Sequence, residues 1–105
     1  MAEQTSDAFN VTAYDDHFRV IAPIAWKEGT SMILHNQTTA ALYGEIRTVE
    51  SGRMISSFSV RAHETLSVAL KLQKNETAVL IPLSPSFQEV TLQFGKKPYE
   101  IPPKR

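Results

Sequence analysis

The sequence predicts an all-β protein, a single immunoglobulin-like β-sandwich of seven to eight antiparallel strands. Apolar and polar residues alternate over several short stretches, and turn-forming residues recur about every 8–12 positions, which is the pattern of small sandwiches. The clearest alternation lies between residues 58 and 72, where apolar residues occupy even positions: Phe58, Val60, Ala62, Leu66, Val68, Leu70 and Leu72. Because side chains alternate across a strand, this stretch is predicted to bury one face of a sheet.

The N-terminal part of the pattern predicts a hairpin. Apolar residues alternate over 9–13 and again over 18–24, and Asp15-Asp16 between them is typical of a tight reversal. Pro23 has no amide donor, so the second run is expected to lie at a sheet edge or to end there.

Two further strands are predicted over residues 31–35 and 40–49, on either side of a polar turn at 36–39. In the longer run the even-numbered residues form the buried face. Gly44, in the middle of that strand, indicates a bulge or the close approach of another backbone.

The second half of the chain is predicted to continue with strands over 54–62 and 66–72, separated by His63-Glu64-Thr65. A helix over 64–74 is the alternative, because apolar residues there also recur four apart. Four apolar residues spaced by two would wrap around a helix, however, so the strand is favoured. The apolar run 78–81 predicts a strand buried on both sides or at the centre of a sheet, and the alternation over 90–94 predicts a final strand.

The 105 residues are enough for one domain with one core. We expect a flexible N-terminus over residues 1–7, the β-sandwich domain over 8–95, and an extended, basic, proline-rich tail over 96–105. No cysteine is present, so neither disulfides nor thiolate-bound metal can stabilise the fold.

Charge and hydropathy exclude some classes of partner and suggest a compartment. Eleven acidic and eleven basic residues cancel, so no overall field favours nucleic acid. No apolar run approaches the roughly eighteen residues that would predict membrane insertion. The polar start Ala2-Glu3-Gln4 is what cleavage at an Ala-x-Ala site leaves, so we expect a periplasmic or secreted protein whose signal peptide has been removed.

Histidine and methionine raise the alternative of a periplasmic copper-handling protein, since imidazole and thioether suit copper. The histidines are His17, His35 and His63, and the methionines are Met1, Met32 and Met54. Met32 and His35 lie three apart on a predicted strand and therefore point to opposite faces. Scattered surface histidines are favoured, and no metal or cofactor is expected.

No catalytic motif is present. Nucleophilic catalysis requires an activated Ser, Cys or Thr, often on a Gly-x-Ser-x-Gly elbow, and the chain has neither that elbow nor a glycine-rich phosphate loop. We therefore expect a protein that is not an enzyme.

Two regions supply candidate binding residues. Trp26 could stack a sugar ring, as in a carbohydrate-binding module, although a core tryptophan is the favoured interpretation. The C-terminal segment combines polyproline character with positive charge, and Lys96, Lys97, Tyr99 and Arg105 are its candidate contact residues.

The order of elements from Ser31 to Leu72 includes the run Phe-Ser-Val-Arg-Ala-His-Glu-Thr-Leu-Ser-Val-Ala-Leu. This order resembles the strand pattern of bacterial immunoglobulin-like modules, which include pilus-type and curli-type periplasmic chaperones. The resemblance covers about forty residues and transfers no functional residue. It implies a binding or assembly module of the bacterial envelope that contacts a protein partner through sheet edges or end loops.

Overall fold

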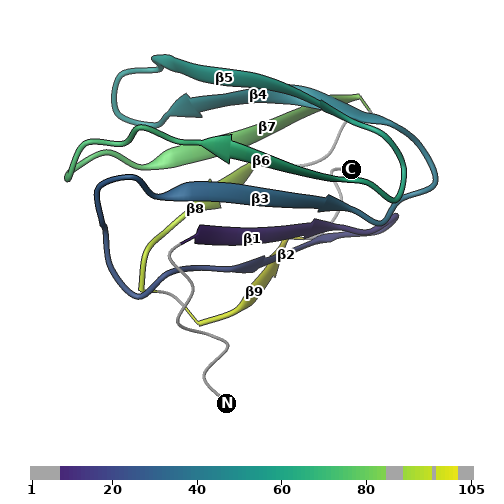
Figure 1. The fold of residues 1–105 in the computed structure, drawn as a ribbon, viewed down its shortest axis with the longest axis horizontal. Coiled ribbons are helices and arrows are strands. Elements are labelled where there is room, and N and C mark those ends of the chain that lie inside the picture. The colour runs from purple at the N-terminus through teal and green to yellow at the C-terminus, as the bar shows by residue number, and fades with distance from the viewer. Residues whose placement is uncertain (1–7, 85–88, 96, 102–105) are drawn as a thin grey trace.

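The computed structural model describes residues 8–84, 89–95 and 97–101, and these contain nine strands and no helix. Five strands form one sheet in the order β6-β3-β1-β2-β9, and four form a second sheet in the order β5-β4-β7-β8. The first sheet consists of β1 (Ala8–Ala13), β2 (Phe18–Ile21), β3 (Ser31–Asn36), β6 (Thr65–Ala69) and β9 (Tyr99–Ile101). The second consists of β4 (Leu42–Thr48), β5 (Met54–Val60), β7 (Ala78–Ser84) and β8 (Val90–Leu92). Figure 1 shows the two layers.

One hydrophobic core lies between the sheets. The first sheet contributes fully buried side chains such as Phe9 and Leu34, and the second contributes Leu42 and Leu80, all in a single cluster. Two mostly antiparallel sheets around one apolar core confirm the all-β class and fit a β-sandwich.

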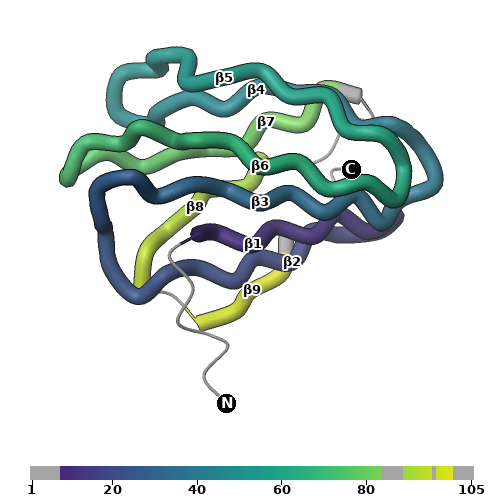
Figure 2. The backbone as a smooth tube through the Cα atoms, viewed as in Figure 1, coloured from purple at the N-terminus to yellow at the C-terminus, as the bar shows by residue number. Residues whose placement is uncertain are grey.

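The alternating stretch over residues 58–72 contributes strands to both sheets, with its first part in β5 and its second part in β6. Phe58 and Val60 are buried on β5, Val68 is buried on β6, and the odd-numbered Ser59 and Ser67 are exposed. The chain crosses from one sheet to the other at residues 61–64, as the tube in Figure 2 shows. The strand prediction is confirmed here over the helical alternative.

The predicted hairpin is also present. β1 and β2 pair in antiparallel fashion from Ala13↔Phe18 to Asn10↔Ile21, and the Tyr14 amide donates to the His17 carbonyl at 2.8 Å. β2 ends before Pro23, which was one of the two expected outcomes. It is not an outer strand, because β9 pairs with its other side.

Two features of the sheets differ from the prediction of seven to eight antiparallel strands. β1 pairs with β3 in parallel, because the β2 reversal and the connection over residues 22–30 turn the chain twice between them. Tyr99–Ile101, predicted as part of a tail outside the sandwich, forms β9. A three-residue strand flanked by prolines has too short an alternation to be recognised from sequence.

Gly44 lies at a shift in strand register and close to a neighbouring backbone, the two features that the sequence indicated for it. The register of β4 against β7 shifts between Tyr43 and Gly44, and a Cβ on Gly44 would overlap the Ile81 carbonyl oxygen. β7 extends beyond the predicted run 78–81, through Pro82 to Ser84. β8 pairs only with Ala78–Leu80, so the missing amide of Pro82 leaves no gap in the β7–β8 ladder.

The two open sides of the sandwich are built differently. On one side, the Tyr99 hydroxyl of β9 donates to the Thr91 carbonyl of β8 at 2.5 Å and links the two sheets. On the other side, β5 and β6 are the outer strands of their sheets. This second side contains the candidate site.

Candidate binding groove

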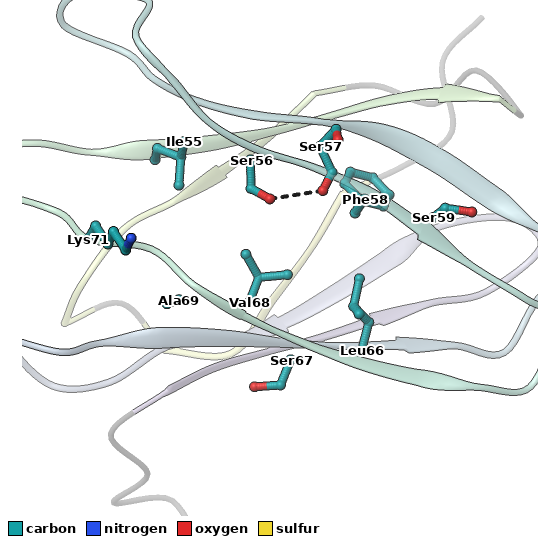
Figure 3. Close-up of a pocket in the computed structure, with 10 residues that line it drawn as sticks. All are labelled: Ile55, Ser56, Ser57, Phe58, Ser59, Leu66, Ser67, Val68, Ala69 and Lys71. Atoms are coloured by element: carbon teal, nitrogen blue, oxygen red, sulfur yellow. Dashed lines mark hydrogen bonds between the residues drawn. The ribbon is translucent and has the colours of Figure 1, made fainter.

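A groove of about 420 Å³ lies between β5 and β6. Its lining residues are Ile55, Ser56, Ser57, Phe58 and Ser59 from β5, and Leu66, Ser67, Val68, Ala69 and Lys71 from β6 and the segment after it. Figure 3 shows these side chains, with Phe58, Val68 and Leu66 toward the middle of the site and Lys71 at the end nearest Ile55. We call this site the β5–β6 groove.

The two walls of the β5–β6 groove are the outer strands of the two sheets. β5 pairs with β4 and β6 pairs with β3, and neither has a second ladder partner among residues 8–84, 89–95 and 97–101. An outer strand presents a row of backbone N–H and C=O groups that another strand can pair with. The groove therefore offers hydrogen-bonding groups along its walls and apolar side chains on its floor.

The sequences of β5 and β6 place few obstacles to pairing along this edge, apart from a register shift at Ile55, which has no partner on β4. Met54–Val60 contains no charged residue, no proline and no glycine, and Thr65–Ala69 of β6 likewise has none. Edge strands commonly use lysine, proline, bulges or short length to prevent pairing with other chains. The opposite side of the sandwich has more of these devices, because β8 and β9 have three residues each and Pro98 precedes β9.

Serine side chains give the β5–β6 groove a mixed surface. Ser56 is half-buried, and its hydroxyl donates to the Ser57 carbonyl at 2.9 Å. Small hydroxyl side chains leave room above the apolar floor of Phe58 and Val68 and can also bond to a visiting backbone. This combination suits an extended peptide better than a compact apolar ligand.

Lys71 is the one charged residue in the lining of the β5–β6 groove. Its backbone adopts a left-handed conformation with φ of 52°, and its side chain is exposed. The Lys71 ammonium has no hydrogen-bond or ion-pair partner within the described part of the chain. It is therefore available to an incoming acidic group.

A second hollow of about 290 Å³ continues past Ala69 and Lys71 toward the turn at residues 28–30. Trp26 lies beside it without forming an open platform. The Trp26 indole N–H donates to the Leu72 carbonyl at 3.1 Å, and the ring is half-buried against the core. Trp26 is thus not one of the buried core residues but packs against them.

The C-terminal candidates are spread over different surroundings. Lys96 and Arg105 lie outside the described residues. Lys97 is exposed and, with Ile24 and Pro98, lines a hollow of about 230 Å³. Tyr99 packs against the core and contacts Thr91, whereas Trp26 contacts Leu72, so the two aromatic candidates do not share a site.

The three histidines have separate neighbours. His17 bonds to Asp16 at 2.6 Å and stacks on Tyr14, and its Nε2 lies 3.9 Å from Glu100. His35 lies on β3, where its ring nitrogens are 3.2 Å from the Thr65 hydroxyl and 3.4 Å from the Asn10 side-chain oxygen. His63, with φ of 67°, lies in the crossing between the sheets. Among the described residues no three His, Cys, Asp or Glu side chains are grouped so as to hold a metal ion.

Sequence reasoning did not identify the β5–β6 groove, although one signal for it is present in the sequence. Met54–Val60 is a seven-residue uncharged strand bounded by Arg53 and Arg61. The pattern does not show that β5 and β6 belong to different sheets, and only that separation makes both strands outer ones.

No protein-family model matches the chain, and comparison with curated proteins and with solved structures gives no significant match. Within the described residues there is no helical segment that could span a bilayer.

Proposed function

We propose that this chain is an immunoglobulin-like, non-enzymatic binding module that holds an extended segment of a protein partner in the β5–β6 groove. The observation that carries the proposal is the pair of uncharged outer strands, of seven and five residues, on one side of the sandwich. A partner strand that pairs with such an edge gains main-chain hydrogen bonds, and side-chain pockets beside the edge supply selectivity.

The connections between the sheets support the immunoglobulin-like type. β3 pairs with β6 in one sheet while β4 pairs with β7 in the other, so the chain crosses between the layers after β3, β5, β6 and β8. Interleaved crossings of this kind are typical of Greek-key sandwiches, which present edges and end loops for binding. The envelope compartment predicted from the sequence is part of this proposal, and fractionation of cells that express the native gene tests it.

The binding proposal is tested with a neutral capped peptide, acetyl-Asn-Ser-Val-Thr-Val-Ser-Asn-amide, titrated into isotopically labelled protein. We expect amide chemical-shift changes concentrated in β5 and β6, together with slower hydrogen exchange along those strands. A matched peptide with proline in place of both valines lacks two amide donors and is expected to produce neither effect.

A pair of variants at one position tests where the peptide binds. Ser56→Phe places a ring in the groove and is expected to abolish the shifts, whereas Ser56→Ala leaves the space open and is expected to retain them. Shifts that persist in the Ser56→Phe protein, or that appear only on β8 and β9, would overturn the proposal.

A further inference from the structure

The charges around the β5–β6 groove carry an inference about the segment that it holds, which rests on the function proposed above. The lining contains no acidic residue, and its one charge is Lys71. Arg61 follows directly after Val60, beyond the other end of the uncharged part of β5, and is exposed. The Arg61 guanidinium, like the Lys71 ammonium, has no hydrogen-bond or ion-pair partner within the described part of the chain.

These two cations mark opposite ends of the groove. Lys71 lies at the end near Ile55, while Ser59 lies at the opposite end (Figure 3). Arg61 is two residues beyond Ser59 in the sequence. Arg61 is six positions after Ile55, which corresponds to about 20 Å of extended chain. Arg53, at the start of β5, is not a third free cation, because it is paired with Glu76 at 2.7 Å.

We propose that the partner segment is an uncharged β-forming stretch with an acidic residue at each end, the two carboxylates about six residues apart. Lys71 then pairs with one carboxylate and Arg61 with the other, and the neutral middle of the segment lies along Met54–Val60. Opposite charges placed at both ends fix the register of a strand that could otherwise slide along a featureless edge.

The same charges disfavour a second copy of this chain as the occupant. If two β5 strands pair in antiparallel fashion about Ser57, Arg53 of one copy lies opposite Arg61 of the other, and this happens at both ends. Like charges directly opposite each other destabilise a strand pair. Glu76 is already paired with Arg53, so this register offers Arg61 no free carboxylate, whereas an acidic partner segment does.

The test compares acetyl-Asp-Ser-Val-Thr-Val-Ser-Asp-amide with the neutral peptide that has Asn at both ends. We expect the acidic peptide to bind about fivefold more tightly at low salt, as two exposed ion pairs allow, and this preference to shrink when salt is raised. Lys71→Gln and Arg61→Gln should each remove part of the preference, and the double variant all of it. Lys74→Gln, which removes an exposed cation outside the groove, is the matched control and should retain it.

Each outcome has a distinct meaning. Equal affinity for the two peptides overturns the charge inference and leaves strand binding in place. Failure of both peptides to bind overturns the proposed function and this inference with it. Dimerisation of the free protein in sedimentation experiments, if abolished by Ser56→Phe, overturns the choice of occupant in favour of a second copy.

Discussion

Gly44 of β4 lies directly opposite Phe58 of β5, and the Phe58 ring occupies the space that a side chain at position 44 would need. A Cβ on Gly44 would come within 2.6 Å of the Phe58 Cζ and would also overlap the carbonyl oxygen of Ile81. Phe58 is buried and forms part of the floor of the β5–β6 groove. The glycine on the inner strand thus allows an aromatic ring to lie flat at the edge of the sheet.

Gly44→Ala is therefore expected to destabilise the protein by about 3 kcal/mol or more, because the added methyl overlaps backbone as well as a ring. Chemical denaturation measures this loss. Gly52→Ala is the matched control, since Gly52 has φ of 70° but no atom within 4 Å of an added Cβ. Its cost should be about 1 kcal/mol, from backbone strain alone. Equal costs at the two positions would contradict the close contact at Gly44.

Asn36 joins the two sheets where the chain leaves β3. Its buried amide donates to the Ala40 and Val60 carbonyls at 2.9 and 3.0 Å and accepts from the Thr38 amide at 2.9 Å. Asn36→Ala should lower the free energy of unfolding by about 2–4 kcal/mol, since buried partners lose their hydrogen bonds. Asn75→Ala, at an exposed turn residue, should change it by less than about 0.5 kcal/mol. A small loss at Asn36 in denaturant titrations would argue against this link.

The Tyr99 hydroxyl should make stability depend on alkaline pH. Burial raises the pKa of Tyr99 above its ordinary value of 10.0, although the hydrogen bond with the Gln93 amide lowers it. The unfolded state therefore ionises first, and the wild-type protein loses stability as pH rises above about 10. Tyr99→Phe should cost about 1 kcal/mol at neutral pH through the lost bond to Thr91.

Because phenylalanine does not ionise, the difference between wild type and Tyr99→Phe should narrow as pH rises above about 10. Urea denaturation of both proteins over a pH series measures this change. A difference that stays constant across that range would show that the Tyr99 hydroxyl is not buried as described.

Glu76 should have the opposite pH dependence. Its carboxylate accepts from the Gln73 amide at 3.0 Å and from Arg53 at 2.7 Å, and the Gln73 bond is the main cause of a pKa below the ordinary 4.5. A lowered pKa stabilises the folded state above pH 4.5, and the stabilisation disappears as pH falls through the folded-state value. Wild type should therefore be more stable than Glu76→Gln at neutral pH, with a difference that closes in acid.

Thermal unfolding at several pH values measures the effect of Glu76→Gln. Glu28→Gln is a suitable control, because the exposed Glu28 carboxylate has no hydrogen bond within the described part of the chain. If Glu28→Gln and Glu76→Gln gave the same pH profile, the turn at residues 73–77 would not depend on the Glu76 carboxylate.

The strands could be predicted wherever apolar and polar residues alternate over enough positions. Which strands pair with one another could not be predicted. The even-numbered positions of β4 and β5 identified Leu42, Ile46 and Phe58 as core residues, because alternation with a period of two places every second side chain on the same face of a strand. The parallel pairing of β1 with β3 depends on where the connection over residues 22–30 lies in space. No local pattern encodes that path.

The candidate site was missed for the same reason. Trp26 and Tyr99 attracted attention as aromatic residues, yet both satisfy their polar atoms within the fold, through Leu72 and Thr91. The β5–β6 groove is lined mostly by serines and apolar residues, and no motif in the sequence connects them with Lys71. Its significance comes from the position of β5 and β6 at the outer edges of two sheets.

The Tyr99 hydroxyl has a mechanical consequence. It connects the layers on the β8–β9 side. On the other side the Asn36 amide of β3 donates to the Val60 carbonyl of β5 at 3.0 Å, and among the described residues no side-chain hydrogen bond joins β5 to β6 directly. Thermal fluctuations of β5 relative to β6 should therefore be smallest near Val60 and larger toward Ile55 and Lys71. Such breathing would admit a strand from that end without unfolding the core, and its extent would depend on the Tyr99 and Asn36 hydrogen bonds on opposite sides of the molecule.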